Sequence, residues 1–171
     1  MPGGCGQSQK RRIQTALKFA GLPFVKTIEE YDFSFHPHLD KKAVMELLDL
    51  TFLFRHENVI FLVPPGVGKT HPAIALAIKA CSHCFKAYFT TMHTLLVKLK
   101  ETQSKGEAYL SASLVIVDEA GYLPVESREA YLFIQFISYR YEKSSTILTL
   151  LHCPVFGEYL SLNVYQYLYM I

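Results

Sequence analysis

The sequence lacks the features that direct a chain into or across a membrane. Residues 1–6 are Gly-rich and contain no apolar core of a signal peptide. No window reaches the roughly 20 consecutive apolar residues that span a bilayer. The nearest candidate, residues 144–171, is interrupted by Pro154, Gly157 and Glu158. We therefore expect a soluble protein that makes no use of a membrane.

Cysteine is scarce, and the four cysteines show no spacing of a disulfide framework. Free thiols persist in a reducing compartment, so we expect a cytoplasmic location. Cys81 and Cys84 have the spacing of two metal ligands, but a structural zinc site takes four ligands and the sequence offers no second pair. We interpret these two cysteines as packing residues.

A strong excess of one charge is missing as well. The formal net charge of +2 does not by itself indicate a nucleic-acid partner. The basic residues are nevertheless concentrated near the N-terminus, at Lys10, Arg11, Arg12, Lys18 and Lys26. Such a run is either a solvated helix face or an arm that faces phosphates, and the sequence leaves both interpretations open.

The apolar periodicity that is present indicates an α/β domain. It predicts helices over residues 9–20 and 40–54, the second capped by Asp40. Further along, apolar runs alternate with helical segments. The predicted strands are residues 58–63, 86–90, 114–117 and 146–150, and the predicted helices are residues 70–82, 94–105 and 128–141. This alternation predicts a parallel sheet with helices on both faces.

The chain divides into three parts on this pattern. Residues 1–39 hold the basic helix and an aromatic connector, residues 40–158 hold the α/β core, and residues 159–171 form an atypical apolar tail. The tail contains four tyrosines and no charged residue, and it shows neither capping signals nor a clear period.

The first predicted strand leads into a Gly-rich loop, and a helix follows. Glycines allow the backbone to wrap around a phosphate with its N–H groups pointing inward, and the helix N-terminus adds its dipole. In such a P-loop Lys69 reaches the β- and γ-phosphates and the Thr70 hydroxyl binds Mg²⁺. The candidate nucleotide-binding residues are Pro65, Gly66, Val67, Gly68, Lys69, Thr70 and His71.

The third predicted strand, residues 114–117, ends in two carboxylates, Asp118 and Glu119. Residues at the carboxyl ends of parallel strands face one crevice, so both should lie near the P-loop. Asp118 would hold Mg²⁺, and Glu119 is placed to orient or deprotonate the water that attacks the γ-phosphate. Glu119 and Lys69 are therefore the candidate catalytic residues.

These motifs resemble the IstB-like ATPases, helper proteins of bacterial transposons related to the DnaC helicase loaders within the AAA+ class. The resemblance runs from about residue 11 to residue 154. Its most specific carriers are the Asp-Phe-Ser-Phe segment at residues 32–35 and Gly-Tyr-Leu-Pro at residues 121–124, soon after Asp118. The resemblance implies a P-loop fold that binds ATP with Mg²⁺. It also implies an ATP-switched homo-oligomer that binds DNA with little sequence preference and acts with a transposase.

The sequence departs from the family at positions with mechanical roles. Val63 stands where the first P-loop glycine is expected, and Pro72 should bias His71 away from the α region. The family's polar Ser-Asn pair after Thr149 is replaced by leucines at residues 150–151. No arginine finger or C-terminal lid is recognisable after Glu158. We therefore expect weak nucleotide binding with slow or absent hydrolysis, because a missing trans-acting arginine can cost ~10³–10⁵ in rate.

Several alternatives stay open. The chain is either an ATP-switched transposition helper or a truncated nucleotide-binding remnant, with residues 159–171 as a degenerate or frame-shifted tail. A small P-loop phosphotransferase ranks last, because such enzymes lack the strand-end Asp-Glu pair. Tyr31, Phe33 and Phe35 of the connector either line the base-binding side of the pocket or pack the N-terminal segment onto the core, and we favour packing.

Overall fold

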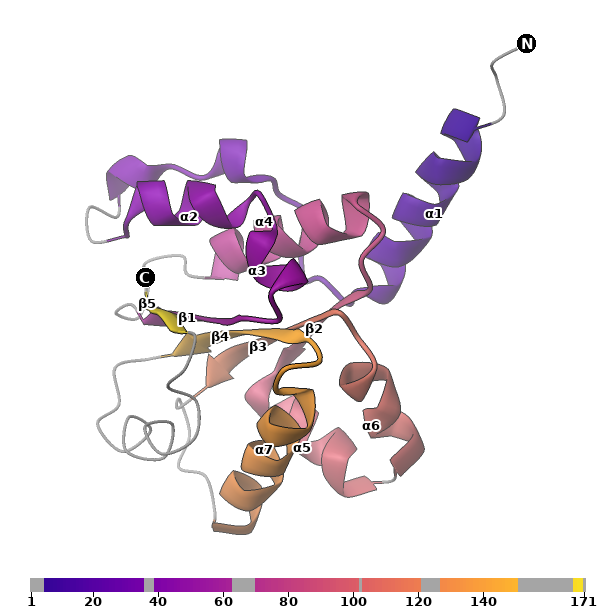
Figure 1. Ribbon diagram of the computed structural model, residues 1–171, viewed down its shortest axis with the longest axis vertical. Coiled ribbons are helices and arrows are strands. Elements are labelled where there is room, and N and C mark those ends of the chain that lie inside the picture. Colours follow the sequence, from indigo (N-terminus) through magenta and orange to yellow (C-terminus); the bar gives the residue numbers. More distant parts are fainter. Residues whose placement is uncertain are drawn as a thin grey trace.

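The computed structural model describes residues 5–35, 39–62, 70–101, 103–120, 127–150 and 168–170. Its centre is a parallel sheet with the strand order β2-β3-β4-β1-β5 (Figure 1). The strands are β1 (Asn58–Leu62), β2 (Ala87–Thr91), β3 (Leu114–Ala120), β4 (Ser145–Leu150) and β5 (Leu168–Met170). All four predicted strands are present, which confirms the parallel α/β architecture.

Helices cover both faces of this sheet (Figure 1). One layer contains α2 (Lys41–Leu47), α3 (Thr51–Phe54) and α4 (Thr70–Ser82), with α1 (Cys5–Phe19) packed beside α4 and projecting away from the body. The other layer contains α5 (Met92–Glu101), α6 (Gln103–Leu110) and α7 (Ser127–Arg140). Two short 3₁₀ helices, η1 (Ile28–Glu30) and η2 (Phe33–Phe35), occupy the aromatic connector.

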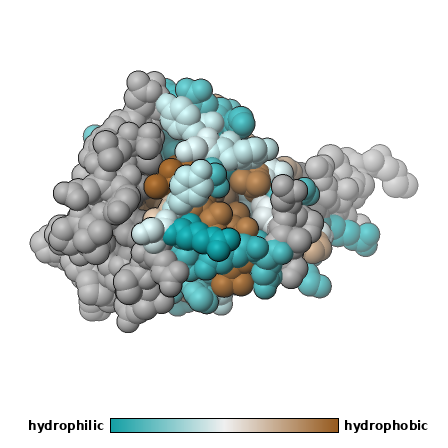
Figure 2. All heavy atoms as spheres, turned by 90° about the horizontal axis from the view of Figure 1, so that it is seen from below, coloured by the Kyte–Doolittle hydropathy of each residue, from teal (hydrophilic) through white to brown (hydrophobic). Residues whose placement is uncertain are grey.

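Alternate residues of the central strands supply the two cores. In β3, Leu114 and Ile116 belong to the core under α4, whereas Val115 and Val117 belong to the core under α5 and α7. Because successive side chains of a strand point to opposite faces, a strand buried on both faces is apolar throughout. On the face seen from below, hydrophobic residues gather near the centre of the view, with hydrophilic residues beside them (Figure 2).

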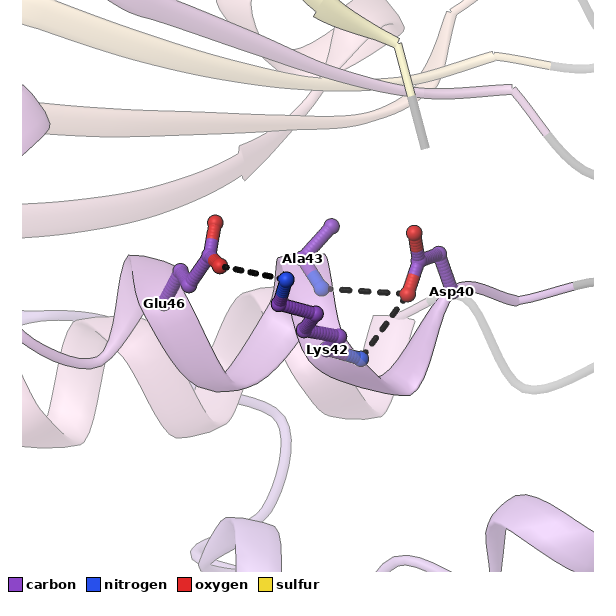
Figure 3. A network of polar contacts seen from close by, with 4 residues as sticks. All are labelled: Asp40, Lys42, Ala43 and Glu46. Atoms are coloured by element: carbon purple, nitrogen blue, oxygen red, sulfur yellow. Dashed lines mark hydrogen bonds and ion pairs between the residues drawn. The ribbon is translucent and has the colours of Figure 1, made fainter.

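Asp40 caps α2 as the sequence predicts. Its Oδ1 atom accepts hydrogen bonds from the backbone N–H groups of Lys42 at 2.8 Å and Ala43 at 3.2 Å (Figure 3). These bonds satisfy two N–H groups that have no partner within the helix. Figure 3 also shows an ion pair between Lys42 and Glu46 at 3.9 Å, whose exposed side chains add little stability.

Two predicted helices are each interrupted in the structure, and the helix expected over residues 9–20 begins earlier, at Cys5. The helix expected over residues 40–54 is divided into α2 and α3, because Leu50 adopts a left-handed conformation with φ of 58° that places its side chain in the core. The helix expected over residues 94–105 begins earlier and is followed by a separate α6. Its start is set by Thr91, whose Oγ1 accepts the backbone N–H of Thr94 at 3.2 Å.

The C-terminal tail contributes an element that the sequence did not predict. Leu168–Met170 form β5, which pairs in parallel with Asn58–Ile60 of β1 at one edge of the sheet. The rest of the tail, residues 159–167 and 171, lies outside the described residues. Within the described part of the chain, no helix combines the length and the apolar character needed to cross a bilayer.

Candidate nucleotide-binding site

The candidate site lies at the carboxyl ends of the central strands, where β1 leads toward α4 and where β3 and β4 end. Helix α4 begins at Thr70, as predicted. The preceding loop, residues 63–69, lies outside the described residues, and with it the predicted site residues Pro65, Gly66, Val67, Gly68 and Lys69. The described part of the site is formed by Thr70, His71, Asp118 and Glu119, and by a fifth residue, Thr149, on β4.

The structure brings Thr70 and Asp118 together, although 48 positions separate them in the sequence. The Oγ1 atom of Thr70 donates a hydrogen bond to Oδ2 of Asp118 at 2.9 Å. Asp118 is only 6% exposed, so its carboxylate depends on protein donors. The second oxygen, Oδ1, accepts a hydrogen bond from the Thr149 hydroxyl. Both carboxylate oxygens are therefore held by threonines from neighbouring elements.

A bulge in β3 places the two carboxylates differently. Val117 pairs with Leu148 and Ala120 pairs with Leu150, so that Asp118 and Glu119 together lie opposite Thr149. Such an extra residue bends a strand and re-aims its side chains. Glu119 adopts a φ of 59° and its side chain is exposed, whereas that of Asp118 is buried. The buried carboxylate can thus face Thr70 while its neighbour faces solvent at the same strand end.

The donor set suits Mg²⁺. This cation prefers oxygen ligands and binds through one or two carboxylates together with substrate phosphates. The hydroxyl oxygen of Thr70 keeps lone pairs free for a cation while its proton is donated to Asp118. No group of three or more His, Cys, Asp or Glu side chains with metal-binding geometry occurs among the described residues, and a site completed by phosphates does not need one.

His71 connects the site to the aromatic connector. It lies in the first turn of α4 despite Pro72, because the first N–H groups of a helix have no helical partner and proline is tolerated there. The expected displacement of His71 from the α region is therefore wrong. Its Nε2 atom lies 2.8 Å from the carbonyl oxygen of Thr27, and its ring meets that of Tyr31 edge-on at 5.2 Å.

The connector packs against the core, which favours the packing interpretation of its aromatic residues. Tyr31 is 9% exposed, belongs to the core under α4 and contacts the ring of Phe33 at 4.8 Å. Burial also raises the pKa of the Tyr31 hydroxyl. The side chain of Phe35 lies outside the described residues. Cys81 is fully buried in the same core, in agreement with its interpretation as a packing residue, whereas Cys84 is exposed and the same interpretation is wrong for it.

The sequence profile of the family described as IstB-like ATP binding protein matches residues 6–160. The chain belongs to this family. An ATP-binding protein of insertion sequence IS21 from Pseudomonas aeruginosa is 45% identical to this IstB-like chain over 146 residues, which cover 82% of the chain and 55% of the relative. Another, of insertion sequence IS5376 from Geobacillus stearothermophilus, is 39% identical over 149 residues, covering 84% and 59%.

The IstB-like chain therefore spans somewhat more than half the length of these relatives. Among solved structures, the crystal structure of the DnaC helicase loader superposes with a TM-score of 0.63 at 21% identity. The match covers 83% of this chain and 85% of the loader. This likeness confirms the predicted AAA+-like P-loop fold.

Sequence reasoning missed one residue of the site. Thr149 looked like an ordinary strand residue before the two leucines that replace the family's polar pair. Its only signal is that it is a hydroxyl residue at the carboxyl end of an apolar strand adjacent to the one that carries Asp118. Of those two leucines, Leu150 is buried in the core under α7, and Leu151 lies outside the described residues.

Proposed function

We propose that this chain is an ATP-binding helper protein of DNA transposition that binds ATP together with Mg²⁺. The observation that carries the proposal is the contact between Thr70 and Asp118, since it joins the end of the P-loop to the strand-end carboxylate. Lys69 and the loop glycines would hold the phosphates through charge and backbone N–H groups. When bound, Mg²⁺ would neutralise charge on the phosphates.

Glu119 is the candidate for activating water. Its side chain is exposed at the strand end, next to the buried Asp118, where a carboxylate can accept a proton from a water molecule. We propose that hydrolysis by this chain is slow, because the sequence has Leu151 where the family has an asparagine that senses the γ-phosphate. This proposal also covers the alternative function, a nucleotide-binding remnant with little or no turnover.

DNA is the proposed macromolecular partner, and α1 is the proposed contact. The helix carries no acidic residue and projects from the body (Figure 1). Arg11 and Lys18 are exposed and lie seven positions apart, on the same helix face, whereas Ala16 and Leu17 pack against the core. Contacts of lysine and arginine with phosphates need no base recognition, which fits low sequence preference. A transposase and further copies of this chain are proposed partners on the family membership.

Nucleotide binding tests the proposal directly. A fluorescent ATP analogue would be titrated into the purified chain with Mg²⁺, alongside Lys69→Ala and a control variant, Lys79→Ala, which removes an exposed lysine of α4. We expect binding that Lys69→Ala abolishes and Lys79→Ala preserves. Absence of binding to a folded wild-type sample would overturn the proposal.

Phosphate release in the same samples separates the two functions. Steady release that DNA stimulates would identify a working ATPase helper. Binding without release would identify the remnant, with residues 150–151 as the candidate cause.

A further inference from the structure

Thr149 makes two hydrogen bonds to the end of β3, one with the carboxylate of Asp118 and one with the backbone of Glu119. Its hydroxyl donates to Oδ1 of Asp118, and the same oxygen accepts the backbone N–H of Glu119 at 3.2 Å. The residue is fully buried at the centre of the sheet, on β4 between β3 and β1. A threonine hydroxyl has one proton to donate and lone pairs to accept with, so a single group fixes two consecutive residues of the bulge.

These bonds are not needed to hold the strands together. β3 and β4 already pair from Leu114 opposite Ser145 to Ala120 opposite Leu150. The pairing is interrupted only at the bulge, and there the Thr149 side chain supplies the acceptor for the Glu119 N–H. What the hydroxyl adds is therefore the orientation of one carboxylate and the position of the backbone that carries the next.

We infer that Thr149 is a positioning residue of the nucleotide site, which holds the Asp118 carboxylate toward Thr70 in the orientation that accepts Mg²⁺; this assignment rests on the proposed function. The three side chains form a continuous chain of contacts: Thr149 donates to Oδ1 of Asp118, and Oδ2 of the same carboxylate accepts from Thr70. Without the Thr149 donor, the carboxylate of Asp118, a residue that is 6% exposed, loses one of the two side-chain donors that fix its orientation.

The test compares nucleotide binding in Mg²⁺ with nucleotide binding in EDTA. Thr149→Val removes the hydroxyl at nearly constant shape. We expect its affinity for the fluorescent ATP analogue in EDTA to stay close to that of the wild type. The Mg²⁺ concentration for half-maximal enhancement should rise about tenfold or more, as expected for loss of a hydrogen bond to a charged group. Thr149→Ser keeps the hydroxyl and should restore most of the Mg²⁺ response.

Thr90→Val is the matched control. Thr90 is a buried threonine of β2, and its hydroxyl bonds only weakly, at 3.3 Å, to the carbonyl oxygen of Thr91. We expect an unchanged Mg²⁺ response in this variant. A second readout uses no ligand at all: the Glu119 amide should exchange its proton with solvent about tenfold faster in Thr149→Val than in Thr90→Val. Thr149→Ala removes the same hydroxyl and replaces Thr149→Val if valine is not accommodated.

Three outcomes would overturn the assignment. An unchanged Mg²⁺ response in Thr149→Val, with normal wild-type binding, would overturn the assignment of Thr149 and leave the proposed function standing. Equal loss of affinity in Mg²⁺ and in EDTA would show that Thr149 only supports the fold. A folded wild-type chain that binds no nucleotide would overturn the proposed function and this assignment with it.

Discussion

The Nε2 atom of His71 lies 2.8 Å from the carbonyl oxygen of Thr27, and this contact joins the residue directly after the P-loop to the connector that leads from α1. The connector is itself locally ordered, because the backbone N–H of Thr27 donates to the Glu30 carboxylate at 2.8 Å. The rings of Tyr31 and Phe24 both meet the imidazole edge-on. A movement of α1 that displaces the connector would therefore disturb the contacts of His71 in the first turn of α4.

Replacing this imidazole should loosen the connector. We expect His71→Ala to lower the free energy of unfolding by about 0.5–1.5 kcal/mol, because an exposed hydrogen bond is lost together with two edge-on ring contacts, while the Thr27 carbonyl keeps the backbone N–H of Glu30 as a donor. Urea denaturation measures the loss, and limited proteolysis should cut the connector earlier. His93→Ala, which removes an exposed histidine of α5, is the control and should leave both measurements unchanged. Equal effects of the two substitutions would contradict the prediction.

Arg140 has a structural role at the opposite end of the central strands, where β3 and β4 begin. Its guanidinium is 1% exposed and donates to the carbonyl oxygens of Tyr109 at 2.5 Å, Ala112 at 2.9 Å and Ser145 at 2.6 Å. Nε also donates to the Thr146 hydroxyl at 3.1 Å. Burial lowers the pKa of Arg140 to about 10, so the group stays charged at neutral pH. One side chain thus ties the end of α6 to the start of β4.

Loss of this side chain should be costly. Arg140→Ala leaves several buried carbonyl groups without donors, each at about 1–3 kcal/mol, so we expect a loss of about 3 kcal/mol or more in the free energy of unfolding. Arg140→Lys should recover only part of it, because an ammonium group cannot reproduce the guanidinium fork. Urea denaturation would measure the free energy of unfolding of both variants. Arg128→Ala, at an exposed position in the first turn of the same helix, should change stability little, and a similar cost there would argue against the assigned role.

The sequence was sufficient for four of the five strands and for the proximity of Thr70 and Asp118. Buried parallel strands are apolar throughout, so β1 to β4 could be recognised without any tertiary information. Thr70 and Asp118 could be paired because strand ends of a parallel sheet share one edge. The break at Leu50 could not be predicted, since a leucine with positive φ is stabilised by the burial of its side chain. The role of Thr149 depends on a bulge, which is a property of two paired strands rather than of either alone.

The positive φ of Glu119 predicts a conflict between stability and activity. A residue other than glycine in the left-handed conformation costs roughly 1–2 kcal/mol, which a substitution by glycine would remove. Glycine also gains freedom in the unfolded chain, and this offsets about 0.5–1 kcal/mol of that stabilisation. We therefore expect Glu119→Gly to raise the free energy of unfolding by up to about 1 kcal/mol. It should at the same time abolish any phosphate release, because the exposed carboxylate at the strand end is gone.

Glu142 provides a control with matched geometry. It also has a φ of 59° and an exposed side chain, but it lies beyond the end of α7, away from the strand ends that form the site. Glu142→Gly should raise stability to a similar extent and leave nucleotide binding and phosphate release unchanged. Destabilisation by both substitutions would contradict the account of their backbone conformation.

Removal of the α1 cations should weaken DNA binding in a salt-dependent manner. Each phosphate contact contributes a slope of about −0.9 to the dependence of log affinity on log salt concentration. The double variant Arg11→Ala/Lys18→Ala should therefore lower the magnitude of this slope by about 1.8, equally for DNA of different sequences.

A charge-matched control separates this contact from a general loss of positive charge. Lys42→Ala/Arg55→Ala removes two exposed cations from the α2–α3 region, where they pair with Glu46 and Glu57. Fluorescence anisotropy with labelled duplexes at several salt concentrations measures both slopes. Equal slopes for the two double variants would mean that net charge, rather than the exposed face of α1, governs binding. A reduced slope in the α1 variant alone would identify that face as the phosphate contact, because the two variants lose the same charge and differ only in where they lose it.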